Sequence, residues 1–80
     1  MNPDAEIAEP VGVKNPKIEN NFTYHAPTTI KQEKYTIFRS FGKELAYLIE
    51  YECPESREKS IAMTKLEEVI MWANASIARN

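Results

Sequence analysis

The sequence SREKSIAMTKLEEVIMWANASIAR, residues 56–79, decides the fold of this chain. Its apolar residues recur every three or four positions, which is the spacing of a helical face. They form two neighbouring stripes, with two further bulky residues outside both: Ala62, Leu66, Val69 and Ala73; Met63, Ile70 and Ile77; and then Ile61 and Trp72. A single partner helix does not cover so wide an arc. The stretch therefore predicts a long helix in a protein that assembles with copies of itself.

An earlier helix is predicted to begin near Thr28 or Thr29. The sequence TIKQ at residues 29–32 fits a capping box, in which the hydroxyl of Thr29 accepts from an early N–H and Gln32 reaches back. The apolar residues that follow trace one stripe: Ile37, Phe38, Phe41, Leu45, Leu48 and Ile49. Gly42 interrupts this stripe at a cost of roughly 1 kcal/mol relative to alanine. It is a candidate for a close approach by another backbone or a ligand.

The two helices are predicted to form an antiparallel hairpin in an all-α fold. The first should end around residues 51–53, because the residue before Pro54 disfavours helical dihedral angles. The second should begin at about Pro54, which suits a first helical turn. A short link then joins them as a hairpin domain over residues 22–80. Residues 1–21 contain three of the five prolines and predict a largely irregular N-terminal arm that reaches across a neighbouring copy.

Length and composition limit the remaining possibilities. A chain of 80 residues forms one domain with a thin core. One cysteine and one histidine allow neither an internal disulfide nor a Cys/His zinc site within one chain. Oligomerisation is then the way to bury more surface. The net charge of −2 argues against a DNA- or RNA-coating role, and there is no membrane-spanning run or signal peptide, so an intracellular location is expected.

The residue types that catalysis requires are few. His25 has no paired carboxylate or cysteine motif, and Cys53 lies beside Glu52 and Glu55, which raise a thiol pKa rather than lower it. No glycine-rich phosphate loop and no catalytic serine or metalloprotease motif occurs. The sequence therefore predicts a protein that is not an enzyme and that needs no metal and no cofactor.

A small anion is a more plausible ligand. Tyr24 lies outside both helical stripes, and it either packs the arm onto the helices or offers a flat platform for a nucleobase. Arg39 and Lys43 lie four residues apart, either as a solvated face paired with acidic neighbours or as phosphate donors. Arg57 has the same ambiguity, whereas Arg79 is explained by the dipole at a helix C-terminus.

Three stretches resemble a known phage domain: residues 22–27 (FTYHAP), with Glu33-Lys34-Tyr35 and Arg39 after them; residues 56–68 (SREKSIAMTKLEE); and residues 71–79 (MWANASIAR). The resemblance is to the hairpin domain shared by the anti-CBASS cyclic-nucleotide sponge and the Thoeris anti-defence sponge of bacteriophages. It covers roughly residues 22–79. It implies a homohexamer in the host cytoplasm that sequesters cyclic oligonucleotides without cleaving them. The implied ligands are cyclic dinucleotides such as 3′,3′-cGAMP and, in a separate pocket, cyclic trinucleotides, so that the CBASS effector is not activated.

The resemblance also suggests which residues bind the ligands. Tyr24 matches the base-stacking tyrosine, with His25 beside it, and either Arg39 or Lys43 matches the phosphate-contacting residue of the first helix. Candidates for the trinucleotide pocket lie in the second helix: Asn74, Arg79 and Arg57. Two rival functions stay open, a nucleotide-degrading enzyme and a helical adaptor that binds and inhibits a host protein.

Overall fold

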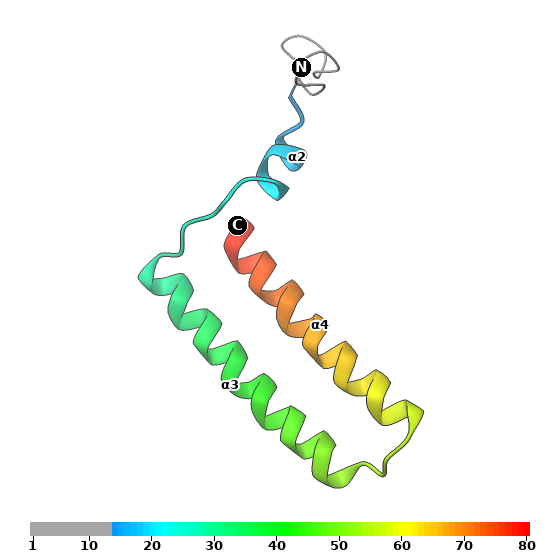
Figure 1. Ribbon diagram of the computed structural model, residues 1–80. Coiled ribbons are helices and arrows are strands. Elements are labelled where there is room, and N and C mark those ends of the chain that lie inside the picture. The colour runs from blue at the N-terminus through cyan, green and yellow to red at the C-terminus, as the bar shows by residue number, and fades with distance from the viewer. Residues whose placement is uncertain (1–13) are drawn as a thin grey trace, which may run out of the picture.

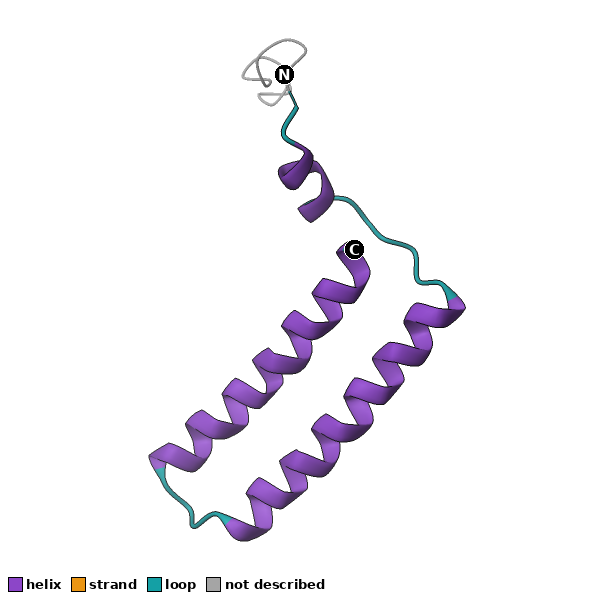
Figure 2. Ribbon diagram, turned by 180° about the vertical axis from the view of Figure 1, so that it is seen from behind, coloured by secondary structure: helices purple, strands orange, loops and turns teal. Residues whose placement is uncertain are grey.

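The computed structural model describes residues 14–80 as three helices (Figure 1). The short α2 spans Pro16–Asn21, and the two long helices are α3 (Thr29–Glu52) and α4 (Arg57–Arg79). The long helices run antiparallel side by side, and α2 lies beyond the end of the hairpin where α4 finishes (Figures 1 and 2). Residues 14–80 contain no strand. The predicted all-α hairpin is confirmed.

The side chain of Thr28 caps the start of α3, one residue before the cap that the predicted capping box would use. Thr28 has an extended backbone, and its hydroxyl accepts a hydrogen bond from the N–H of Lys31 at 3.2 Å. The N-cap is therefore Thr28 rather than Thr29, and Gln32 lies one position beyond the place where it could reach back. The end of α3 is as predicted, because Cys53, just before Pro54, is extended.

The start of α4 lies three residues after the predicted Pro54. Ser56 is extended, and its hydroxyl accepts from the N–H of Lys59 at 3.1 Å while donating to the carbonyl of Pro54 at 3.0 Å. A serine side chain can satisfy an unpaired N–H of the first turn, which a proline ring cannot. This hydrogen bond places the helix start at Arg57 and corrects the prediction.

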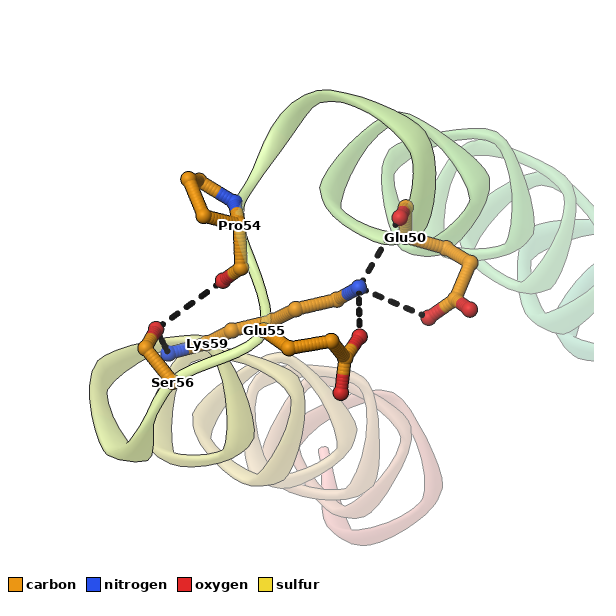
Figure 3. A network of polar contacts seen from close by, with 5 residues as sticks. All are labelled: Glu50, Pro54, Glu55, Ser56 and Lys59. Atoms are coloured by element: carbon orange, nitrogen blue, oxygen red, sulfur yellow. Dashed lines mark hydrogen bonds and ion pairs between the residues drawn. The ribbon is translucent and has the colours of Figure 1, made fainter.

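The side chain of Lys59 bridges the two helix ends at the turn between α3 and α4 (Figure 3). Its ammonium donates to the carbonyl of Glu50 at 2.9 Å, near the C-terminal end of α3. It also pairs with the carboxylates of Glu55 at 2.5 Å and Glu50 at 3.3 Å, and its side chain is only 9% exposed. The hydrogen bond with Glu55 raises the pKa of Lys59 above 10.5, with help from Glu50 and against the effect of burial. One side chain thus joins the last turn of α3 to the first turn of α4.

The long helices approach each other closely at Gly42, the one buried residue of α3. A Cβ atom at this position would lie 2.9 Å from both Cγ1 and Cδ1 of Ile70 in α4. On α4, residues from both predicted apolar stripes are half-buried, among them Leu66, Ile70 and Ile77. The close approach expected at Gly42 is therefore one between the two helices of the hairpin.

The hairpin leaves much apolar surface uncovered. No apolar side chain of residues 14–80 is fully buried. On α4, the outer part of the predicted arc is exposed, including Val69 and Trp72. The apolar stripe of α3 is exposed as well, with Phe41 at 68%. A single copy therefore lacks the core that a stable domain needs, which supports the prediction of assembly but does not define its stoichiometry.

The helix α2 lies inside the segment predicted as an arm. Asn15 is its N-cap, accepting from the N–H groups of Lys17 and Ile18, and Pro16 begins its first turn. Six residues do not form a stable helix alone, so α2 depends on its contacts with the rest of the chain. It adds local structure to an arm that was predicted to be largely irregular. Residues 1–13 of the predicted arm lie outside the described part.

Candidate functional site

A hollow of about 540 Å³ lies between α2 and the last turns of α4. Its lining combines two cations, three side-chain amides, a hydroxyl, an indole and a methyl group: Lys17, Arg79, Asn20, Asn21, Asn80, Ser76, Trp72 and Ala75. Within residues 14–80, neither cation has an ion-pair partner. Cations, amides and an exposed ring are the groups that bind phosphates and nucleobases.

Two hydrogen bonds, one from α2 and one from the first turn of α3, reach the end of α4. The side-chain amide of Asn20 donates to the carbonyl of Arg79 at 3.0 Å, and the ammonium of Lys31 donates to the carbonyl of Ala78 at 3.2 Å. These are carbonyls of the last helical turn, which have no partner within the helix. Since the backbone end of α4 is satisfied in this way, the guanidinium of Arg79 is not needed as a cap and remains available to the hollow.

Trp72 is a residue of this site that the sequence reasoning assigned to the core or an interface. Its side chain is 60% exposed and lines the hollow. Its spacing in the sequence could have indicated this role. The same helical face carries Trp72, Ser76 and Arg79 at intervals of four and three residues. Lys17 and Asn20 gave no such signal, because only the packing of α2 brings them to α4.

Tyr24 and His25 lie in the segment between α2 and α3. The ring of Tyr24 is 83% exposed, so within one chain it does not pack the arm onto the helices. His25 is half-buried, and its Nε2 lies 2.7 Å from the carbonyl of Asn20, to which the protonated nitrogen donates. His25 therefore supports the C-terminal end of α2, while Tyr24 is free to meet a ligand or another copy.

Arg39 and Lys43 are exposed on α3, and neither has an ion-pair partner within residues 14–80. The alternative of a paired surface, for example with Glu44, is not what the structure shows. Arg39 lies ten residues after the start of α3, about 15 Å along the helix axis. The segment that carries Tyr24 leads away from that start (Figure 1). One chain therefore does not bring Tyr24 and Arg39 together, and a shared site would need two copies.

The structure also separates the residues predicted for a trinucleotide pocket. Arg57 lines a hollow of about 350 Å³ at the other end of α4 from Arg79, roughly 33 Å along the axis. Asn74 lies five residues before Arg79, which places it about 140° away around the helix. Its Oδ1 atom is buried, and no donor within residues 14–80 reaches it. This acceptor could receive a hydrogen bond from a second molecule.

The described part of the chain contains neither a cluster of metal ligands nor a membrane-spanning helix. Among residues 14–80, no three His, Cys, Asp or Glu side chains come together as metal ligands would. None of the helices described there is long and apolar enough to span a bilayer.

Comparison with known proteins adds one finding. A protein-family model, the Acb2/Tad1 hairpin domain, matches residues 14–78. Searches of curated proteins and of solved structures gave no significant match. The matched residues begin at residue 14, before α2, whereas the hairpin domain was predicted to begin at residue 22.

Proposed function

The chain belongs to the Acb2/Tad1 hairpin domain family of phage anti-CBASS and anti-Thoeris sponges, and from this premise we propose its function. It sequesters cyclic oligonucleotide second messengers in the cytoplasm of the infected host without cleaving them. Its ligands are cyclic dinucleotides such as 3′,3′-cGAMP and cyclic trinucleotides. Removal of the free messenger then keeps the CBASS effector inactive.

The observation that supports this proposal most directly is the composition of the hollow between α2 and α4. Lys17 and Arg79 provide two positive charges without an ion-pair partner among residues 14–80, and a guanidinium can bind a phosphate through two parallel hydrogen bonds. The exposed ring of Trp72 can stack on a base, an interaction worth about 1–3 kcal/mol. The amides of Asn20 and Asn21 can donate to or accept from the edge of that base. Phosphate, base face and base edge are thus each matched by a group of this site.

Cyclic dinucleotides are proposed to bind at a second site that two copies build together. Tyr24 of each copy stacks on one base, and Arg39 or Lys43 contacts a phosphate. A cyclic dinucleotide has matching halves, so a two-fold axis between copies would present each half with the same groups. A nanomolar Kd corresponds to about −12 kcal/mol, more than one stacked base and one ion pair supply. We propose a homohexamer as the assembly that creates such paired sites.

The first test is capture and release. The protein is mixed with 3′,3′-cGAMP or a cyclic trinucleotide and filtered, and the free nucleotide is quantified before and after the protein is denatured. Depletion followed by recovery of intact nucleotide is the expected result. Depletion without recovery would instead reveal an enzyme, and no depletion would contradict binding of the nucleotide tested.

Variants then separate the two sites. Tyr24→Ala should weaken binding of the cyclic dinucleotide at least tenfold through the lost stacking and leave assembly unchanged. Arg79→Gln should weaken the trinucleotide and spare the dinucleotide. Arg57→Gln, at the far end of α4, is the matched control for Arg79 and should bind both ligands as the parent protein does. Equal effects of the Arg57 and Arg79 changes would contradict the assignment of the hollow.

A rival function has some support from the apolar face of α3. Exposed side chains such as Phe41 and Leu48 could meet a host protein instead of further copies of this chain. In that case the protein would be a helical adaptor. The adaptor would be monomeric or dimeric in solution and would leave cyclic nucleotides free, so mass measurement and the capture assay distinguish the two functions.

A further inference from the structure

A ledge of three side chains, Lys43, Tyr47 and Tyr51, runs along α3 toward the turn, starting at one of the candidate phosphate contacts described above. The residues are spaced by four, so they follow one another on the same side of the helix. The rings of Tyr47 and Tyr51 are stacked, with centroids 6.1 Å apart and planes inclined by only 10°. Both rings are exposed, at 53% and 75%. The two tyrosines therefore present a continuous aromatic surface to solvent.

A hollow of about 310 Å³ adjoins this ledge between α3 and α4. Its walls are Lys43 and Tyr47, its apolar parts are Ala46 and Met63, and Glu50 completes the lining. This volume is at the lower end of the range found for small-molecule sites, which is about 300–1,000 Å³. A ligand the size of one nucleotide therefore fits this hollow better than a cyclic dinucleotide or trinucleotide does.

The charges of the hollow favour an anion. Glu50 is its one acidic residue, and the Glu50 carboxylate lies 3.3 Å from the ammonium of Lys59 (Figure 3). The Glu50 charge is thus already compensated on the side of the turn. Lys43 has no ion-pair partner within residues 14–80, so its ammonium is the free charge of the hollow. Along the axis, Lys43 lies one turn, about 6 Å, before Tyr47.

We propose that this ledge binds a planar aromatic ring that carries an anionic group, in the way that a mononucleotide does. The ring lies against Tyr47 and the apolar side chain of Met63, and the anionic group meets the ammonium of Lys43. Tyr51 supports Tyr47 from behind through their stacked rings and extends the surface toward the turn. This binding needs neither Tyr24 nor the hollow between α2 and α4, so it differs from the sequestration of cyclic oligonucleotides even where Lys43 serves both.

The test uses the full-length protein and adenosine 5′-monophosphate as the probe, with binding followed by ligand-observed NMR or calorimetry. One ring and one charge at an open site predict a Kd on the order of 0.1–1 mM. Adenosine, which lacks the charge, and ribose 5-phosphate, which lacks the ring, should each bind about tenfold more weakly. Higher salt should weaken the monophosphate and leave adenosine little changed.

Variants connect this binding to the ledge. Tyr47→Ala should weaken adenosine monophosphate about tenfold, and Lys43→Gln should weaken it severalfold while abolishing its salt dependence. Tyr51→Phe keeps the stacked ring and is the conservative control, expected to bind as the parent does. Tyr24→Ala should also leave this binding unchanged while weakening the cyclic dinucleotide, so failure of one proposal is distinguishable from failure of the other.

Three results would overturn the proposal. The first is an absence of binding at several millimolar probe. The second is binding that Tyr47→Ala and Lys43→Gln leave unchanged. The third is a loss of both assembly and probe binding in Tyr47→Ala, because the ledge would then be an interface between copies rather than a ligand site.

Discussion

At the scale of single residues, Gly42 determines how closely the two long helices can approach. In Gly42→Ala, the new methyl group would meet Ile70 at 2.9 Å, and a β-branched side chain has few other rotamers in a helix. The helix would gain about 1 kcal/mol from the better propensity of alanine. Overpacking costs about 1–3 kcal/mol and should prevail. We expect the free energy of unfolding to fall by about 1 kcal/mol, measured by urea denaturation at one protein concentration.

The control for this prediction is Ser40→Ala on the same helix. Ser40 is exposed, so alanine there should raise stability slightly through propensity alone. Adding Ile70→Val to Gly42→Ala removes one of the two crowded carbons and should restore part of the loss. If Gly42→Ala were as stable as the parent, the helices would have room to spare at their crossing.

Lys59 gives a second residue-scale prediction, concerning pH. Its pKa is raised in the folded chain, chiefly by the hydrogen bond with Glu55, so folding favours the protonated form. The resulting stabilisation is fully present below about pH 10.5 and is lost as the pH rises through the higher pKa of the folded state. We expect Lys59→Met to lower Tm by several degrees at neutral pH. This deficit should shrink above pH 10.5, measured by thermal denaturation of both proteins across that range.

Lys65→Met is the matched control for this effect. Lys65 pairs with Glu68 at 3.6 Å, but its side chain is 67% exposed, and such surface pairs contribute little. Its replacement should change Tm by much less than the Lys59 change at every pH. A deficit of Lys59→Met that stayed constant to high pH would show that packing of the lysine stem, not its charge, fastens the turn.

Side-chain chemistry explains which of these residue-scale features could be predicted. The end of α3 before Pro54 follows from a local steric rule, and the sequence predicted it. The start of α3 was predicted correctly but its cap was assigned to the wrong threonine, and the start of α4 was misplaced, because several candidates for a cap stood close together. Thr28 and Thr29 are both able to cap, and Pro54 and Ser56 both suit a helix start. Only the hydrogen bonds in the folded chain decide between them.

At the scale of elements, α2 depends on a tertiary contact for its stability. Its six residues are too few for a helix alone. The amide of Asn20, donating to the carbonyl of Arg79, is the described hydrogen bond that joins α2 to α4 directly. We expect Asn20→Ala to speed amide hydrogen exchange of Glu19 and Phe22, whose N–H groups donate within this turn, by about two- to tenfold.

Asn21→Ala is the control for this prediction, because Asn21 lines the same hollow without a side-chain hydrogen bond to α4. It should leave the exchange of Glu19 and Phe22 close to that of the parent. Unchanged exchange in Asn20→Ala would mean that α2 is held by its N-cap, Asn15, and by apolar contacts instead.

The same dependence explains why α2 was not predicted while α3 and α4 were. The long helices can be predicted because their apolar residues recur at three- and four-residue intervals over more than twenty positions. The segment of α2 has no such periodicity, and its proline and asparagines resemble an irregular stretch. The candidate site was therefore predicted only in part. Arg79 on α4 was predicted, but Lys17 and Asn20 were not. These two residues lie on α2, which forms only through its contact with the end of α4.

At the scale of the whole molecule, the exposed apolar surface decides how the chain can be stable. No apolar side chain of residues 14–80 is fully buried, and exposed rings and aliphatic groups cover α3. A hairpin of this kind gains most of its buried apolar area by associating with copies, so unfolding and dissociation should be coupled. We expect Tm to rise with protein concentration, and the mass in solution to be a multiple of the chain mass, six-fold under the proposed homohexamer.

The decisive variant for this last prediction is Phe41→Glu. Phe41 lies in the middle of the α3 stripe with 68% of its surface exposed, so in one copy a glutamate there would be solvated and cost little. In an interface the same carboxylate would lose its water without a partner, which is strongly unfavourable. Phe41→Glu should therefore reduce the mass measured by light scattering and remove the concentration dependence of Tm. Ser40→Glu adds the same charge one residue away, outside the stripe, and should leave the assembly intact. If Phe41→Glu assembled as the parent does, the α3 stripe would be free in the oligomer, and that outcome would favour a host protein as its partner.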